Sequence, residues 1–530
     1  MSPERRFWLA VGLIALLALA LRLKGIHDPI LDHPGWRQGD TAAIARNFAQ
    51  LRYNPLFPQT DYDGPPPNYV ELELQIVPFL AATLYKLAGV HEIFGRLISL
   101  GFGVATIPLL AVFGRWLFRS PAAGIGAAAM FAVMPGAWYY SRTFMPDTAM
   151  TFFLTAALYA CARWIVDDEA RSWRSWWPAA LLLAVAFLAK PVAVVGAIPI
   201  GAAAIAGFGW RGAAVRPQLW ALAAVAGIPL VLYDAFVSSH AEWHWASGIT
   251  RLHVVPSLVA ALTSPAGFLQ KAHYLEGVLK MLGSTMTGPI GLALGVAGLC
   301  IPLRSRSNAL VWGWVGGGVL YAYLVVTVER VDYYLYILLP LLALGAGNVV
   351  AQIFERFNTD PRSRIAAGSA GVLVALAALF TGYREIAPYY HWNHANYVRA
   401  KMLDATLAPG VLVVMGHYDP SILYTIGRKG WEEDPRLWTP FDEESAIRKG
   451  ARYYISIEDK RLRAGNLELY CYLARFPLLD PSAAWPVYLT DPAKVLPGAE
   501  ARWDAFRQRE RAGAYADWSH EWKSQPNPCR

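Results

Sequence analysis

Long apolar runs recur along most of the chain, from Phe7 to about Phe380, and many approach the length that crosses a lipid bilayer. Their number and spacing predict a polytopic membrane protein. We predict about eleven transmembrane helices, at residues 7–24, 96–118, 121–140, 146–166, 176–190, 191–209, 217–236, 285–303, 308–328, 333–354 and 364–383.

From about residue 386 the apolar runs give way to mixed polar and charged positions, which predicts a soluble domain over 386–530. Strand-like runs at Val411–Met415 and Tyr453–Ile457 alternate there with helical segments, and Gly427–Trp431 has the composition of a turn. The predicted fold class is therefore a polytopic α-helical membrane protein, with a membrane domain at 1–385 and a C-terminal α/β domain. Two loops of the membrane domain, about 24–96 and 237–284, are long enough to carry function.

Arginines gather in alternate connections between the predicted spans, which indicates the orientation of the chain. If Arg5 and Arg6 lie in the cytoplasm, every predicted inner connection contains arginine. The apolar run Ile76–Val90 would reverse this order if it were a span. It is short and contains Lys86, so we predict a helix on the outer surface instead. The N-terminus is then cytoplasmic and the C-terminal domain lies outside.

Composition supports this picture, because 530 residues that are 55% hydrophobic, with a mean hydropathy of +0.30, are unusual for a soluble protein. The formal net charge of +8 is explained by the inner-loop arginines and needs no nucleic-acid partner. Cys471 and Cys529 both fall in the predicted outer domain, where a disulfide is permitted, although their spacing does not require one.

The segment Trp36–Phe48, soon after the first span, has helical spacing and places an acid beside a cation. Arg37 lies three residues before Asp40 and shares one helix face with it. A carboxylate beside a guanidinium stays ionised and can act as a general base, so Asp40 is a candidate catalytic residue and Arg37 a candidate substrate-binding residue. The structural alternative is an ordinary ion pair at a helix start.

A second acid-bearing segment, Arg142–Asp147, precedes another predicted span. Asp147 is a candidate catalytic residue, although aspartate at this position is also a favoured helix N-cap. In the first loop Glu73 is a candidate substrate-binding residue. Glu71 competes for that role, and either acid can simply be solvated.

Several cations predicted on the outer side are candidates for contacts to phosphate oxygens. They are Arg142, Lys190, Arg251, Lys271 and Arg330. The alternative for Lys190 is a side chain that only extends to the membrane interface. His240 and His244 have helical metal-ligand spacing, but no third ligand is evident, so a divalent metal is not indicated. The sequence contains no glycine-rich nucleotide loop, which argues against a nucleotide substrate.

These features together resemble the GT-C glycosyltransferases, most nearly the bacterial protein-mannosyltransferase and lipid A aminoarabinose-transferase superfamily (glycosyltransferase families 39 and 83). The resemblance covers roughly residues 7–385 and rests on order and spacing more than on any single motif. It is carried by the acid-bearing first loop, by Glu73 before Leu84–Gly89, by Arg96, by Arg142–Asp147, and by the tyrosine-bearing span Tyr333–Pro340.

The resemblance implies transfer of a sugar, with inversion, from a polyprenyl phosphate such as undecaprenyl phosphate to an acceptor hydroxyl on a lipid, glycan or protein. The reaction would occur at the periplasmic face of a bacterial inner membrane, and Tyr333 and Tyr334 would join the substrate-binding residues. Aligned on Ala42, Ile44 and Arg46, the first aspartate of the family falls at Arg37, one helical turn before Asp40. Whether Asp40 or another acid is the base therefore stays open.

Two other classes of function stay in view. A transporter or flippase predicts ionisable residues near the bilayer midplane and paired halves of the chain, neither of which is evident. A binding or scaffold protein predicts that Asp40 and Asp147 can be neutralised without loss of function.

Overall fold

The structure is a computed structural model, and it describes residues 1–167, 172–241, 250–303, 305–357, 360–480, 482–523 and 527–529. The chain divides into two compact units. Unit 1 comprises Met1–His27, Tyr53–Phe57 and Glu71–His391. Unit 2 comprises Asp28–Arg52, Pro58–Val70 and Trp392–Arg530.

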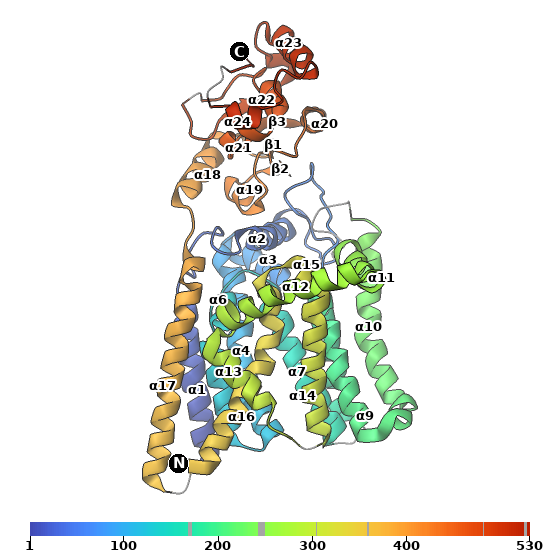
Figure 1. Ribbon diagram of the computed structural model, residues 1–530, viewed down its shortest axis with the longest axis vertical. Helices are drawn as coiled ribbons and strands as arrows, with labels where there is room; N and C mark the ends of the chain where they lie inside the picture. The colour runs from blue at the N-terminus through green and yellow to red at the C-terminus, as the bar shows by residue number, and fades with distance from the viewer. Residues whose placement is uncertain are drawn as a thin grey trace. The chain divides into compact units, whose positions relative to one another are not determined.

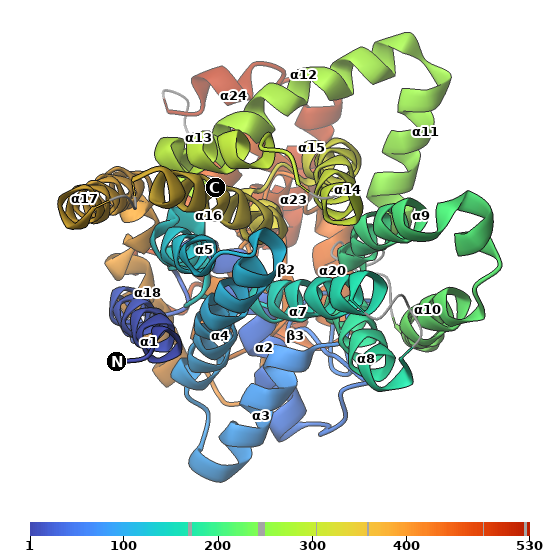
Figure 2. The same cartoon turned by 90° about the horizontal axis from the view of Figure 1, so that it is seen from below.

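Unit 1 is a helical bundle, shown from the side in Figure 1 and from below in Figure 2. Its longer helices are α1 (Pro3–Arg22), α3 (Ile76–Ala88), α4 (Glu92–Phe118), α5 (Pro121–Val133), α7 (Asp147–Val166), α8 (Trp173–Ala189), α9 (Ala197–Ala214), α10 (Pro217–Ser238), α12 (Pro265–Met281), α13 (Gly288–Leu299), α14 (Ser305–Tyr321), α16 (Leu339–Phe357) and α17 (Pro361–Ile386). Shorter helical segments are α6 (Pro135–Tyr140), η1 (Pro191–Gly196), η2 (Thr250–Val254), α11 (Val255–Thr263), η3 (Leu282–Met286), η4 (Ala322–Val326), α15 (Thr327–Glu329), η5 (Asp332–Leu338) and η6 (Ala387–Tyr390).

Each of the eleven predicted spans coincides with one to three consecutive helical segments, and the predicted fold class is confirmed. Among the described residues, seven helices are long and apolar enough to cross a membrane, or eight if the bent pair 265–286 and 288–299 is one span. The remaining predicted spans correspond to α1, which is rich in charge at its ends, and to the shorter apolar helices α5 and α8.

The segment predicted as a second long loop is largely helical, which corrects the prediction. It contains α11 and α12, and both are seen side-on in Figure 2, where α7 and α14 are seen nearly end-on. The chain then bends by 109° before α13. Gly288 at this bend has a φ of +68°, a conformation that glycine adopts without steric cost.

Backbones approach closely where small residues face each other in the bundle. A Cβ atom placed on Gly298 of α13 would lie 1.7 Å from the carbonyl oxygen of Gly345 in α16. Glycine at both positions therefore lets the two helices pack backbone to backbone, as is common between helices in membranes.

Unit 2 is built around a four-stranded sheet of order β2-β1-β3-β4. The strands β1 (Leu412–Met415), β2 (Lys429–Glu432) and β3 (Ala451–Ile455) are parallel, and β4 (Val487–Leu489) pairs with β3 in the antiparallel direction. Its helical segments are α2 (Gly35–Gln50), α18 (His394–Thr406), α19 (Pro420–Ile426), α20 (Pro440–Arg448), α21 (Asp459–Gly465), α22 (Leu467–Leu473), η7 (Pro492–Lys494), α23 (Ala499–Arg511) and α24 (Trp518–Glu521).

The two predicted strands are confirmed as β1 and β3, but the predicted turn at Gly427–Trp431 is wrong in part. Gly427 ends α19 in the left-handed conformation, and β2 follows at once. Glycine occurs at position 430 for another reason than a turn. Its φ is +145°, and its backbone lies against β1 with no room for a side chain.

Two segments of the first loop, Asp28–Arg52 and Pro58–Val70, belong to unit 2. The predicted domain boundary near residue 386 assigns the whole loop to the membrane domain. The Gly430 amide donates to the carbonyl oxygen of Asp61 over 2.9 Å, and the Gly64 amide donates to the carbonyl oxygen of Gly430 over 2.8 Å. Residues 61–64 thereby cover the outer edge of β2. Helix α2 packs on α19, where a Cβ atom on Gly39 would lie 2.6 Å from the Ser421 backbone.

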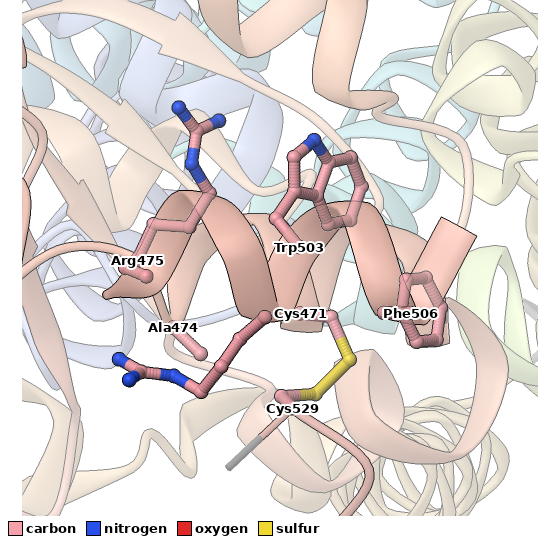
Figure 3. Close-up of a pocket in the computed structure, with 8 residues that line it drawn as sticks. Cys471, Ala474, Arg475, Trp503, Phe506 and Cys529 are labelled. Atoms are coloured by element: carbon pink, nitrogen blue, oxygen red, sulfur yellow. A yellow bond between two sulfur atoms is a disulfide. The ribbon is translucent and has the colours of Figure 1, made fainter. Parts of the chain in front are cut away.

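A disulfide joins Cys471 in α22 to Cys529 near the C-terminus. The bridge that the sequence permitted but did not require is therefore present. Figure 3 shows it beside Trp503 and Phe506 of α23, in a hollow that is too narrow to admit a water molecule.

We predict that Gly430→Ala destabilises unit 2 by at least about 3 kcal/mol, because a Cβ atom there would be strained by the positive φ and would lie 2.0 Å from the carbonyl oxygen of Val413. The matched control is Gly410→Ala, where φ is +75° but no atom lies within 4 Å. Its expected cost is only about 1 kcal/mol. Thermal unfolding of the purified protein measures both, and equal effects would contradict the argument.

Candidate functional site

An ion pair joins two of the predicted site residues, Asp147 and Lys190, in unit 1. Asp147 is the first residue of α7, and Lys190 ends α8 because Pro191 follows and cannot continue the helix hydrogen bonding. The Lys190 Nζ lies 2.7 Å from Asp147 Oδ1, and both side chains are buried. The contact unites two residues that the sequence analysis treated separately.

Two predicted tyrosines complete this group, which we name the Asp147–Lys190 cluster: Asp147, Lys190, Tyr333 and Tyr334. The Lys190 Nζ lies 4.2 Å from the ring centre of Tyr334 and 5.4 Å from that of Tyr333. The Tyr321 hydroxyl donates to the Tyr334 carbonyl over 2.9 Å, which holds η5 in place. Asp147 Oδ2 is buried and has no hydrogen-bond partner among the described residues. That oxygen is available to accept a hydrogen bond from a bound molecule or water.

Asp332, directly before these tyrosines, was missed by the sequence analysis. Its carboxylate accepts hydrogen bonds from the hydroxyls of Tyr140 and Tyr389, each over 2.6 Å, and of Thr285 over 3.1 Å. These contacts tie the start of η5 to α6, η6 and η3. An acid at the start of an apolar span was the only available signal, and it does not reveal hydroxyl partners distant in sequence.

Arg142 contacts residues outside the Asp147–Lys190 cluster. It is fully buried and donates to the Gly25 carbonyl over 2.8 Å, and Arg96 donates to the same carbonyl over 2.6 Å. The Arg142 guanidinium also lies 4.6 Å and 4.5 Å from the ring centres of Tyr139 and Tyr390. These contacts hold together the ends of several helices.

The other predicted outer cations make separate contacts. Lys271 donates to Ser257 Oγ over 2.8 Å, and the Arg330 guanidinium lies 3.5 Å from the ring centre of Tyr274. The side chain of Arg251 lies outside the described part of the structure, as does His244.

Glu73 belongs to a segment that is fixed through its backbone. Its carbonyl oxygen accepts hydrogen bonds from the Tyr233 hydroxyl and the Gln75 amide, over 3.1 and 3.0 Å. The next residue, Leu74, donates its amide to the Leu188 carbonyl of α8, two residues before Lys190. The Glu73 side chain itself is half-buried.

Asp40 lies in unit 2, on the face of α2 that also carries Arg37, as predicted from their spacing. It is only 3% exposed and hydrogen-bonds to the Tyr62 side chain. Burial raises the pKa of Asp40 to about 7, although Arg37 and Tyr62 act in the opposite direction. Asp419 and Asp63 add to the rise through charge repulsion.

A buried ionic network in unit 2 was also missed. Arg46 and Lys429 both pair with Asp61, and Asn47 donates to Asp61 Oδ1 over 3.0 Å. Burial opposes ionisation of Asp61, but Arg46 and Lys429 outweigh it and hold the pKa of that carboxyl below its ordinary value. This network joins α2, the 58–70 segment and β2.

The two predicted catalytic acids therefore occupy different units, Asp147 in unit 1 and Asp40 in unit 2. Each is buried and has one carboxylate oxygen without a partner among the described residues. Their environments differ, since Asp147 contacts a lysine, while the largest influence on the Asp40 carboxyl is burial, which Arg37 opposes only in part.

We predict that Lys190→Met lowers stability by about 3 kcal/mol, because it leaves the Asp147 carboxylate buried without a cation. The double variant Asp147→Asn with Lys190→Met is expected to recover most of that loss. Thermal unfolding of both variants in one detergent tests the coupling. A double variant as unstable as Lys190→Met alone would show that the ion pair is not the cause.

Residues 75–233 match the profile of the family described as dolichyl-phosphate-mannose-protein mannosyltransferase. A comparison with curated proteins gave no match. Among solved structures, ArnT from Cupriavidus metallidurans bound to undecaprenyl phosphate is similar, with 13% identity and a TM-score of 0.58, covering 92% of this chain and 99% of that one.

The archaeal oligosaccharyltransferase AglB from Archaeoglobus fulgidus, in complex with an inhibitory peptide and a dolichol-phosphate, is also similar. It is 12% identical with a TM-score of 0.60, and the match covers 94% of this chain and 76% of AglB. At such identities the similarity establishes the fold. Together with the family match over 75–233, it bears out the predicted resemblance to the GT-C glycosyltransferases.

Proposed function

We propose that this protein transfers a sugar from a polyprenyl phosphate to a hydroxyl group of an acceptor at the periplasmic face of a bacterial inner membrane, with inversion at the sugar. The observation that carries the proposal is the presence of two buried carboxylates, Asp40 and Asp147, in a chain with the GT-C fold. The acceptor is a hydroxyl-bearing lipid, glycan or protein.

In the proposed reaction Asp40 is the general base. The acceptor oxygen forms a bond to the anomeric carbon as its proton passes to the Asp40 carboxylate. The bond between that carbon and the phosphate oxygen breaks, and its electron pair leaves with the lipid phosphate. A carboxylate with a pKa of about 7 suits this role, because it is a stronger base than an ordinary aspartate and is still ionised in a large fraction of molecules near neutral pH.

Within unit 1, Lys190 is the proposed contact for the phosphate of a lipid donor. Asp147 holds its ammonium group, and the tyrosine rings of the Asp147–Lys190 cluster lie beside it. A cation in a buried site stabilises developing phosphate charge more strongly than it would in water. Arg37, Glu73, Arg142, Arg251, Lys271 and Arg330 stay in the proposal as further substrate-binding candidates.

The donor class is supported by the ligands of the two structural neighbours, undecaprenyl phosphate in ArnT and a dolichol-phosphate in AglB. The proposed orientation places the N-terminus in the cytoplasm and the C-terminal domain in the periplasm. The Cys471–Cys529 disulfide favours that placement, since such bridges persist in oxidising compartments.

We predict that the purified protein in lipid releases sugar from one member of a panel of undecaprenyl-phosphate monosaccharides when host membrane extract supplies the acceptor. Asp40→Asn should lower the rate by about 100-fold or more, because it removes the base. The wild-type rate should fall as the pH drops through about 7, where Asp40 becomes protonated. Thr41→Ser, in the next position of α2, is a matched control expected to retain activity. Normal turnover by Asp40→Asn would exclude Asp40 as the base.

The orientation gives a separate prediction. A reporter that is active only in the periplasm should be active when fused after Arg530, because an odd number of spans carries the chain across the membrane. A cytoplasmic fluorescent reporter at the same position should give signal only if the proposed topology is wrong.

A further inference from the structure

A cavity of about 1190 Å³ lies inside unit 1, away from the Asp147–Lys190 cluster. The first turns of α1, the last turns of α4, α7 and α16, and the start of α14 surround it. Helix α7 begins at Asp147 and lines the cavity near Val166, at its other end. A helix of 20 residues is about 30 Å long, so the cavity is a separate site at the opposite end of the bundle, the end that carries the N-terminus in Figure 1.

The wall of the cavity is polar where an ordinary transmembrane helix would be apolar. Asn348, Gln352 and Glu355 of α16 are spaced by four and three residues, so they form one stripe, and all three line the cavity. Ser307 of α14 lines it as well. Polar and ionisable groups within membrane helices are costly, and they commonly mark a site for a polar ligand.

Some of the charged groups around the cavity already have partners. The Arg115 Nη1 lies 2.9 Å from Glu4 Oε2, and the Trp8 indole donates to Glu4 over 3.2 Å. The Asp167 carboxylate accepts from the Trp116 indole over 2.9 Å and from Arg163 over 3.1 Å. These charged groups are paired with one another or with indoles, and they form part of the cavity wall.

Two oppositely charged groups are left over. Arg119, at the end of α4, and Glu355, in the last turn of α16, both line the cavity. Neither has a hydrogen bond or ion pair among the residues that the structure describes. Among the described residues, the cavity therefore presents one cation and one anion without a partner, together with the Gln352 amide.

We propose that this cavity binds the headgroup of an aminophospholipid, with its phosphate on Arg119 and its primary amine on Glu355. Guanidinium groups suit phosphate oxygens, and a carboxylate suits an ammonium donor. The source is the surrounding leaflet, because the cavity lies among helix ends, where lipid headgroups meet the protein, and pockets of this kind between transmembrane helices bind lipid headgroups. Its volume exceeds that of an ordinary small-molecule pocket and accommodates a headgroup with its glycerol.

The test titrates the delipidated full-length protein in detergent with phosphatidylethanolamine or phosphatidylglycerol of the same acyl chains, and counts bound lipid by native mass spectrometry. One phosphatidylethanolamine should bind about tenfold more tightly than phosphatidylglycerol, which lacks the amine. Arg119→Gln should weaken both lipids by about tenfold, and Glu355→Gln should remove only the preference for phosphatidylethanolamine. Arg211→Gln, in the last turn of α9 and outside the cavity lining, is the matched control and should change neither.

Gln352→Trp places an indole in the polar stripe of α16 and should weaken binding of both lipids, while the thermal unfolding midpoint checks folding. Equal affinity for the two lipids, or binding that is insensitive to Arg119→Gln and Glu355→Gln, would overturn the proposal. Displacement of the lipid by soluble glycerophosphoethanolamine at equal concentration would assign the same chemistry to a water-soluble phosphate ester and refute the lipid source. Because the readout is lipid binding, its failure is distinct from failure of the proposed sugar transfer.

Discussion

The cost of burying charge is the constraint on which the organisation of unit 1 depends. Asp147 can lie in the apolar bundle because Lys190 reaches it, and this requires α8 to end at Pro191 and η5 to bring Tyr333 and Tyr334 beside the ammonium group. Breaking such a pair is more costly than replacing it, so the positions of three distant segments depend on one contact. Asp332 follows the same rule with three hydroxyl partners in place of a cation.

Unit 2 meets the same constraint differently. Asp61 is buried but paired with two cations, whereas burial raises the pKa of Asp40 because Arg37 offsets the loss of water only in part. The groups that act on Asp40 come from α2, the 58–70 segment and the N-cap of α19. Its basicity is therefore a property of the assembled unit. The C-terminal part of the chain therefore contributes directly to the environment of the proposed base, through Asp419.

Helix α7 links two polar regions of unit 1. It begins at the Asp147–Lys190 cluster and ends at the wall of the large cavity, and the residues between these ends pack mainly in the apolar core. Chemistry on a lipid-borne substrate at one end and a lipid headgroup site at the other are both consistent with a bundle that holds its polar groups at the helix ends, where desolvation costs least.

The sequence by itself determined the helical membrane class, the two strands β1 and β3 and the shared face of Arg37 and Asp40, because periodicity and local spacing are written in neighbouring residues. It also supplied Asp147, Lys190, Tyr333 and Tyr334 as candidates, but could not pair them, since 43 residues separate Asp147 from Lys190 and no local pattern records such a contact. Only the tertiary structure showed the strand at Gly430, the hydroxyl partners of Asp332, and the packing of the first loop with the C-terminal sheet. Each depends on segments far apart in the chain, and their free energy comes from burial and pairing that exist only after the chain has folded.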